Sequence, residues 1–159
     1  IAVEKDSSGN LKFFLGFGTG PVDNGGPGKL VQGSPTIPLN AYIYDLSSLV
    51  ANGTTEATYA KQFSNGPASS FAGDMVSSDY DLDNSAEGMY FGVVTNPSAV
   101  GGAFGGGLWK IDMRTAAGVE SPLPGTWKGL LPIYNGGTPV TVRPTLARDP
   151  SGRDFIYFG

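Results

Sequence analysis

An internal repeat of roughly 70 residues constrains the fold of this chain more than any other feature. Three times, a turn rich in Asp, Ser, Asn or Gly leads into an aromatic run that ends in glycine, at residues 6–18, 81–92 and 149–159. Two further pairs of similar segments lie between these turns, at residues 41–46 and 108–113 and, more weakly, at 57–63 and 126–131. Each repeat unit therefore predicts about four strands.

Four antiparallel strands that recur at a fixed spacing are typical of a β-propeller blade. The sequence therefore predicts an all-β fold, a partial propeller of about two and a half blades, each a four-stranded antiparallel sheet. Blade one is expected at about residues 1–68, blade two at about 69–138 and the start of blade three at 139–159. Glycine-rich loops at 21–35 and 96–107 should lie on one rim, and residues 46–58 allow a short helical turn. A β-sandwich is the alternative fold, but sandwich strands do not recur as a four-strand module.

The composition supports a β-rich globular chain and excludes several classes of function. The 25 glycines and 12 prolines indicate turns, because 40% of the residues are apolar and disordered chains have much less to bury. A net charge of −4 without a basic run argues against nucleic-acid binding, and the apolar runs are too short for a membrane span. Histidine and cysteine are both absent, which excludes zinc sites and Ser-His-Asp chemistry within the chain.

The sharpest chemical feature is an acidic loop at residues 79–87. Its acidic residues alternate at Asp79, Asp81 and Asp83, and Glu87 lies at its far end. Calcium prefers about six to eight hard oxygen ligands, and alternating aspartates in a tight loop can point inward together. The loop therefore predicts a calcium site formed by these four carboxylates and by Ser85 through its backbone carbonyl.

The acidic loop leaves two alternatives open. Calcium loops need a sharp turn at the position of Asn84, where glycine is usual and asparagine is the next best residue for a left-handed backbone. A bare acidic turn is one alternative, since Asp and Asn are common turn residues, although four carboxylates without a cation would repel one another. Magnesium is the other, and it fits less well because it prefers fewer protein ligands and more water.

The remaining turns, glycine clusters and tryptophans predict structure rather than chemistry. Asp6 and Asp149 lie in the equivalent turns of the other repeats and are expected to form Asx-type turns without a cation. The glycine clusters at 16–20 and 101–107 are not expected to bind phosphate or a dinucleotide, because no helix follows them. Trp109 and Trp127 are expected to pack in the core rather than to stack on a ligand.

Three segments together resemble the C-terminal β-propeller of PilC/PilY-type type IV pilus tip proteins. The acidic loop runs into Met-Tyr-Phe-Gly at 89–92, and a Leu-Trp-Lys-Ile-Asp strand follows at 108–112. Residues 139–144, with the turn at 149–152 and the Tyr-Phe-Gly at the end, are similar to the third motif of that family. The resemblance spans nearly the whole chain but covers only part of the family's propeller. Leu82 and Asn84 stand where the family's loop has glycines, and Glu87 replaces its last aspartate.

This resemblance implies a secreted, non-enzymatic module at the pilus tip or outer membrane of a Gram-negative bacterium. Calcium would tune its action in pilus assembly, retraction control and surface adhesion. The implied partners are minor pilins or other pilus components, a host or abiotic surface, and the remaining blades of the same polypeptide, since two and a half blades cannot close a ring. The alternatives are a quinoprotein-dehydrogenase-like propeller enzyme and another extracellular calcium-binding propeller, integrin-like or lectin-like.

Overall fold

The computed structural model describes residues 1–22, 37–47, 58–96, 102–151 and 153–159. Within these ranges the chain forms an all-β fold, as the sequence predicts, with one short 3-10 helix, η1 (Pro124–Thr126). The strands are β1 (Ala2–Lys5), β2 (Leu11–Gly18), β3 (Ala41–Asp45), β4 (Thr58–Phe63), β5 (Ser70–Ser78), β6 (Gly88–Thr95), β7 (Gly105–Asp112), β8 (Gly129–Tyr134), β9 (Thr145–Arg148) and β10 (Asp154–Tyr157).

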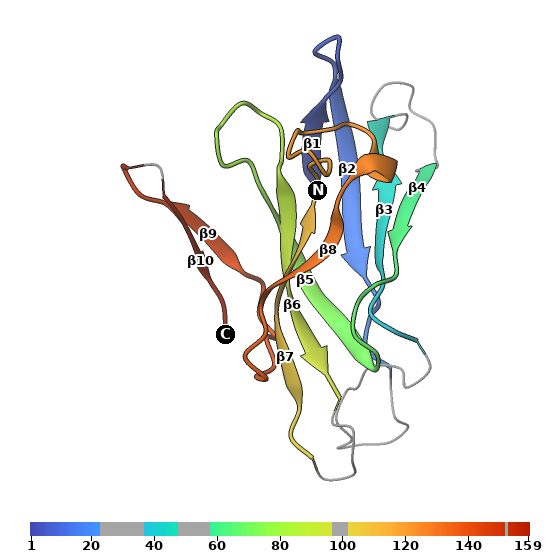
Figure 1. Ribbon diagram of the computed structural model, residues 1–159, viewed down its shortest axis with the longest axis vertical. Coiled ribbons are helices and arrows are strands. Elements are labelled where there is room, and N and C mark those ends of the chain that lie inside the picture. The colour runs from blue at the N-terminus through green and yellow to red at the C-terminus, as the bar shows by residue number, and fades with distance from the viewer. Residues whose placement is uncertain (23–36, 48–57, 97–101, 152) are drawn as a thin grey trace.

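Eight of these strands form two four-stranded antiparallel sheets, and in each sheet strands that follow one another in sequence are neighbours. The first sheet has the order β1-β2-β3-β4 and the second the order β5-β6-β7-β8 (Figure 1). The four-stranded antiparallel sheets that the sequence predicts are thereby confirmed. The sheets also follow the sequence repeat, because β1 and β5 each lead into one of its polar turns.

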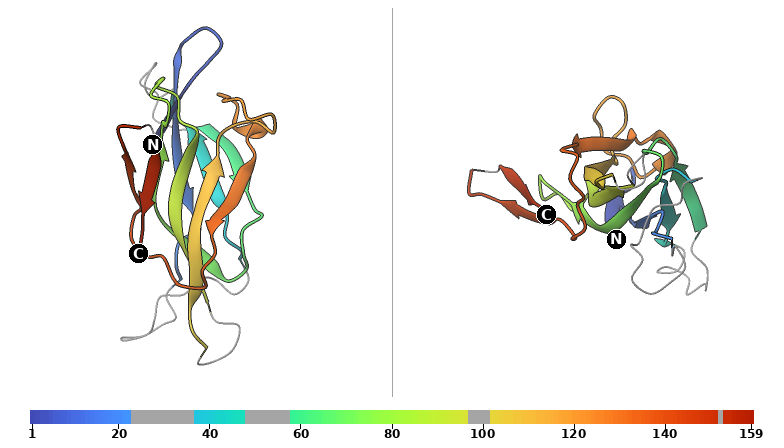
Figure 2. Two further views of the ribbon diagram at one scale, coloured as in Figure 1. Left: turned by 60° about the vertical axis from the view of Figure 1, so that its left-hand side comes forward. Right: turned by 90° about the horizontal axis from the view of Figure 1, so that it is seen from below.

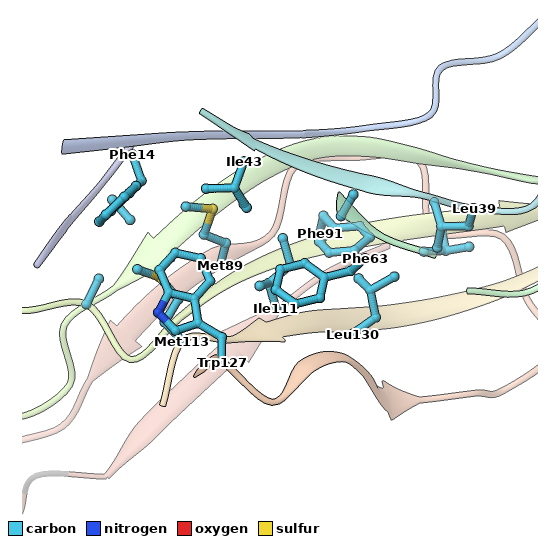
Figure 3. Packing of buried hydrophobic residues seen from close by; sticks show 14 residues of the cluster. Phe14, Leu39, Ile43, Phe63, Met89, Phe91, Ile111, Met113, Trp127 and Leu130 are labelled. Atoms are coloured by element: carbon cyan, nitrogen blue, oxygen red, sulfur yellow. The ribbon is translucent and has the colours of Figure 1, made fainter. Parts of the chain in front are cut away.

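The two sheets pack face to face, and the hydrophobic core lies between them (Figure 3). Alternation along the strands explains which side chains are buried, since successive residues of a strand point to opposite faces. Residues of both sheets join one buried cluster, which includes Phe14, Ile43 and Phe63 of the first sheet and Met89, Phe91, Ile111 and Leu130 of the second.

Trp127 lies at the centre of the aromatic part of this core. Its ring meets Phe14 edge-on at 5.4 Å between centroids and stacks on Phe63 at 6.4 Å. Its indole N–H donates a 2.7 Å hydrogen bond to the carbonyl of Ser121, so the one polar atom of the ring is satisfied. Trp109 is half-buried against the same cluster. The predicted core role of both tryptophans is confirmed.

Two glycines of β2 let the sheets approach each other closely. A side chain at Gly16 would overlap the sulfur of Met89, and one at Gly18 would overlap Ala72. The backbone of the two sheets also meets here, because the Ala72 amide donates a 3.0 Å hydrogen bond to the carbonyl of Thr19. The glycines of the aromatic-glycine repeat therefore have a packing function.

Strands β9 and β10 form a separate antiparallel hairpin that projects from the rest of the fold, with β9 close to β5 (Figure 2). The chain reaches the hairpin across the outer side of the second sheet, where Val140 is buried and packs over Gly92. The sheets do not close into a ring, and the blade boundaries stay predictions. Much of the two predicted glycine-rich loops and of the possible turn at 46–58 lies outside the described residues. No helix in the described ranges is long and apolar enough to cross a membrane.

Candidate metal centre

The acidic loop at 79–87 connects β5 to β6 and is shaped by its own side chains. The carboxylate of Asp79 accepts a hydrogen bond from the amide of Asn84 at 2.9 Å. The Asp83 carboxylate accepts from the amide of Ser85 at 2.7 Å, and that of Asp81 accepts from the amide of Asp83 at 3.3 Å. The last two are Asx-type turns, whereas the bond to Asp79 spans five residues and closes the loop.

Two residues of the loop adopt the left-handed backbone conformation that favours glycine. Asn84 has φ 70°, which confirms its predicted turn conformation. Leu82 has φ 63°, although its side chain is 71% exposed and gains little from packing. A leucine in this conformation costs about 1–2 kcal/mol, so the rest of the loop must hold it there.

The structure brings three of the predicted metal ligands together. Carboxylate oxygens of Asp79, Asp81 and Glu87 all lie within 4.8 Å of one another. A second group with the same mutual distances consists of Asp81, Asp83 and Glu120. Asp83 is thus grouped with Asp81 but not with Asp79 and Glu87, and a residue from outside the loop joins it. These acidic clusters could bind a metal ion.

Ser85 has a role in the structure that its sequence position does not suggest. Its side chain is buried, and its hydroxyl donates a 2.5 Å hydrogen bond to Oε2 of Glu4. Glu4 comes from β1 of the first sheet and is fully buried. The backbone carbonyl of Ser85 stays a prediction as a metal ligand.

Sequence reasoning missed two glutamates at this site, Glu4 and Glu120, which lie outside the loop. Glu120 lies in the connection between β7 and β8, and its carboxylate comes within 4.8 Å of those of Asp81 and Asp83. No local pattern marks that position. The position of Glu4 could have been recognised from the sequence, because alternate residues of a strand point to the same face and Glu4 therefore points inward with Ala2. A charged residue at an inward strand position indicates a buried partner.

Buried carboxylate oxygens without a protein partner gather at this site. Among the described residues, four buried side-chain oxygen or nitrogen atoms lack a hydrogen bond, and three of them are Oε1 of Glu4, Oδ1 of Asp79 and Oε1 of Glu87. Burial without a partner costs a polar group about 1–3 kcal/mol, and a charged group more. Such oxygens are therefore expected to meet a proton, a water molecule or a cation.

The electrostatics of the site disfavour ionisation of its glutamates. Burial raises the pKa of Glu4 to about 8, against the hydrogen bond from Ser85, and the charges of Glu120, Glu87 and Asp83 add to the rise. Burial likewise raises the pKa of Glu87 to about 7, opposed by the backbone amide of Tyr80, which donates to it at 2.8 Å. The pKa of Glu120 is also raised, by burial and by the charges of Asp83 and Asp81. A bound cation would reverse this balance.

Asp112, close to this site, is a buried carboxylate whose charge is balanced by cationic side chains. Its oxygens lie 2.9 Å from Nε of Arg114 and 3.6 Å from the ammonium groups of Lys110 and Lys128. Burial alone would raise its pKa, but the hydrogen bond from Arg114 and the charge of Lys110 lower it. Apart from the ammonium group of Lys5, which donates to the carbonyl of Asp83, the acidic cluster has no comparable set of cations among the described contacts.

The polar turns of the other two repeats form the predicted Asx-type turns. Asp6 accepts hydrogen bonds from the amides of Ser8 and Asn10, both at 2.9 Å. Asp149 accepts from the amide of Ser151 at 2.8 Å and pairs with Arg153. Both are Asx-type turns, and neither belongs to a group of three metal-ligating side chains in the described ranges.

No protein family, curated protein or solved structure matches this chain. The geometry of the acidic cluster is therefore the main evidence on what the protein does.

Proposed function

We propose that the acidic loop binds calcium, with Asp79, Asp81, Asp83 and Glu87 as carboxylate ligands and Ser85 as a carbonyl ligand. The observation that carries this proposal is the set of buried carboxylate oxygens without a protein partner. A cation would satisfy these oxygens and offset the repulsion that raises the pKa of Glu87.

Calcium fits this donor set better than the other common divalent metals. All the side chains of the cluster offer oxygen, and the chain contains no histidine or cysteine for a softer metal. Calcium accepts about six to eight oxygens in a flexible arrangement, whereas magnesium demands a small octahedron and keeps several waters. A loop with four carboxylates and a nearby fifth, from Glu120, suits the larger ion.

Calcium titration of the 159-residue chain by calorimetry tests this proposal. Calcium should release or absorb heat with a stoichiometric end point, and magnesium should compete weakly. Asp81→Asn should weaken binding most, because Asp81 belongs to both carboxylate groups. Asp149→Asn, in the equivalent turn of the β9–β10 hairpin, should bind as the wild type does. No heat with the wild type, or equal binding by Asp81→Asn, would refute the calcium site.

We further propose that the two sheets are propeller blades, and the register of the strands supports this reading. Aligning Asp45 with Asp112 superposes the pairing of β2 with β3 on that of β6 with β7. Four residues of the first sheet then match four residues of the second: Leu15, Phe17, Tyr42 and Tyr44 match Met89, Phe91, Trp109 and Ile111.

The matched positions face the core in the second sheet but face outward in the first sheet. The four residues of the second sheet pack into the core against the first sheet. Their counterparts lie on the outer face of the first sheet, where Phe17 is 44% exposed and stacks on Tyr42 at 5.6 Å and on Tyr44 at 5.7 Å. In a two-sheet sandwich the outer faces of both sheets are polar. In a propeller each blade uses the same apolar face to pack against its neighbour. An aromatic outer face therefore favours blades over a sandwich, with further blades of the polypeptide as the cover.

We propose that this calcium-binding blade pair acts, without catalysis, in a secreted protein at a type IV pilus tip. The support is the resemblance of the acidic loop and the two following segments to PilC/PilY-type propellers. On this proposal the protein works outside the cell or at the outer membrane of a Gram-negative bacterium, in pilus assembly, retraction control and adhesion. Minor pilins and a host or abiotic surface are the proposed partners.

A genetic test separates this role from the alternatives. In the encoding bacterium, Asp81→Asn should change the number of surface pili or the adhesion of cells, while Asp149→Asn should not. Unchanged piliation and adhesion would refute the pilus role, while a calcium-binding extracellular propeller of another kind would still stand. An absorbance band from a bound quinone would favour the enzyme alternative instead.

A further inference from the structure

The acidic loop of the second sheet is held by three consecutive residues of the first sheet. The carbonyl of Val3 accepts a 2.7 Å hydrogen bond from the amide of Ala86. Glu4 accepts from the hydroxyl of Ser85, and the Lys5 ammonium group donates to the carbonyl of Asp83. Every residue of β1 from Val3 to Lys5 thus bonds to the second half of the loop. Figure 1 shows this loop beside β1, at one end of the sheets.

Glu120 reaches the same loop from a third segment. It lies between β7 and β8, and a backbone bridge between Arg114 and Glu120 fixes this connection close to the end of β7. Its carboxylate oxygen lies within 4.8 Å of those of Asp81 and Asp83. The cluster therefore combines loop residues with one carboxylate from the β7–β8 connection, and Glu4 of the first sheet contacts the loop through Ser85.

We propose that the cation site joins the two sheets, with Glu120 as a direct ligand beside Asp81 and Asp83, and Glu4 as a positioning residue that acts through Ser85. This inference rests on the proposed cation binding. A bound cation would hold the loop against β1, and removal of the cation would weaken that contact.

Charge and burial give the reason for this coupling. Glu4 is fully buried, one of its oxygens binds Ser85 and the other has no protein partner. Without a cation, docking β1 on the loop leaves that second oxygen buried without a partner. A cation among the carboxylates would attract an ionised Glu4 and would therefore favour this docking. A bound cation then raises the equilibrium constant for docking of β1 on the loop, and docking raises the affinity for the cation by the same factor.

Hydrogen exchange of backbone amides, measured with calcium and with chelator on the 159-residue chain, tests this proposal. In the wild type, calcium should slow exchange in residues 2–5 and 79–87 by about tenfold or more, whereas the β9–β10 hairpin should change little. Glu4→Gln keeps an acceptor for Ser85 but removes the charge. It should still bind calcium in the loop, with about tenfold lower affinity, and lose the protection of residues 2–5.

Two further variants keep the test decisive if Glu4→Gln folds poorly. Ser85→Ala removes the link from the loop side and should abolish the protection of residues 2–5 in the same way. Glu120→Gln should lower calcium affinity by about tenfold or more, because it removes a direct ligand. Asp149→Asn is the matched control and should behave as the wild type does.

The outcomes separate this inference from the proposed function. If calcium protects the loop but not residues 2–5, or if both Glu4→Gln and Ser85→Ala keep the full protection, the joining of the sheets is wrong and the calcium site stands. Full calcium affinity in Glu120→Gln would remove Glu120 from the site. No binding by the wild type would overturn the calcium site itself.

Discussion

Replacing Glu4 with glutamine should change how the stability of the protein depends on pH. Burial raises the pKa of Glu4 to about 8 in the folded protein, against an ordinary value of 4.5. The folded state therefore holds a proton that the unfolded state releases. Stability from this group is complete below pH 4.5, and it is lost as the pH rises toward 8.

The size of the effect follows from the two pKa values. Between pH 5 and pH 7, ionisation of Glu4 should lower the free energy of unfolding by about 2.5 kcal/mol in total. Glutamine resembles the protonated glutamate and does not titrate, so Glu4→Gln should lack this term. Glu87, whose pKa is raised to about 7, contributes in the same sense in both proteins and cancels in the comparison.

Urea unfolding with chelator present, followed by tryptophan fluorescence at pH 5, 6, 7 and 8, measures this difference. The stability of the wild type should fall relative to that of Glu4→Gln as the pH rises. Asp149→Asn should run parallel to the wild type, because hydrogen bonds from Arg153 lower the pKa of Asp149, which therefore titrates below this range. A stability difference between wild type and Glu4→Gln that stays constant from pH 5 to pH 8 would show that the pKa of Glu4 is not raised by folding.

Two other substitutions test the core and the loop backbone. Trp127→Ala should lower the free energy of unfolding by about 3–5 kcal/mol, because it removes the ring between Phe14 and Phe63, and Trp127→Phe should lose less. Urea unfolding measures both, and a loss below about 1 kcal/mol for Trp127→Ala would contradict the packing. Leu82→Gly should stabilise the protein by about 0.5–1 kcal/mol, because glycine tolerates φ 63° and the leucine is exposed. Leu82→Ala should give no such gain in the same assay, and equal effects of the two would argue against backbone strain.

The fold was predictable from the sequence because its signals are local and repeated. Polar turns next to aromatic runs fix where strands start and end, and the recurrence of Asp45 as Asp112 fixes a four-strand unit. Inward alternation then accounts for the burial of Phe14 and Ile43. Closure of the sheets into a propeller could not be predicted from these local signals, since closure depends on contacts between repeats.

The candidate site was predictable only as far as it is local. Asp79, Asp81 and Glu87 lie within nine residues, and the structure brings them together. Glu4 and Glu120 reach the cluster only because the sheets pack and the β7–β8 connection folds back. A contact between residues so far apart in the sequence leaves no spacing pattern in one chain. Only the inward-pointing position of Glu4 in β1 indicated it.

A crystal structure of the 159-residue chain, grown with saturating calcium, would test the proposed calcium site. Anomalous density for calcium is expected within the acidic cluster, with oxygens of Asp79, Asp81 and Glu87 at about 2.3–2.6 Å from the ion. Glu120 should ligate the same ion together with Asp81 and Asp83. Well-ordered density for the loop with water alone among these carboxylates, at saturating calcium, would refute the calcium site.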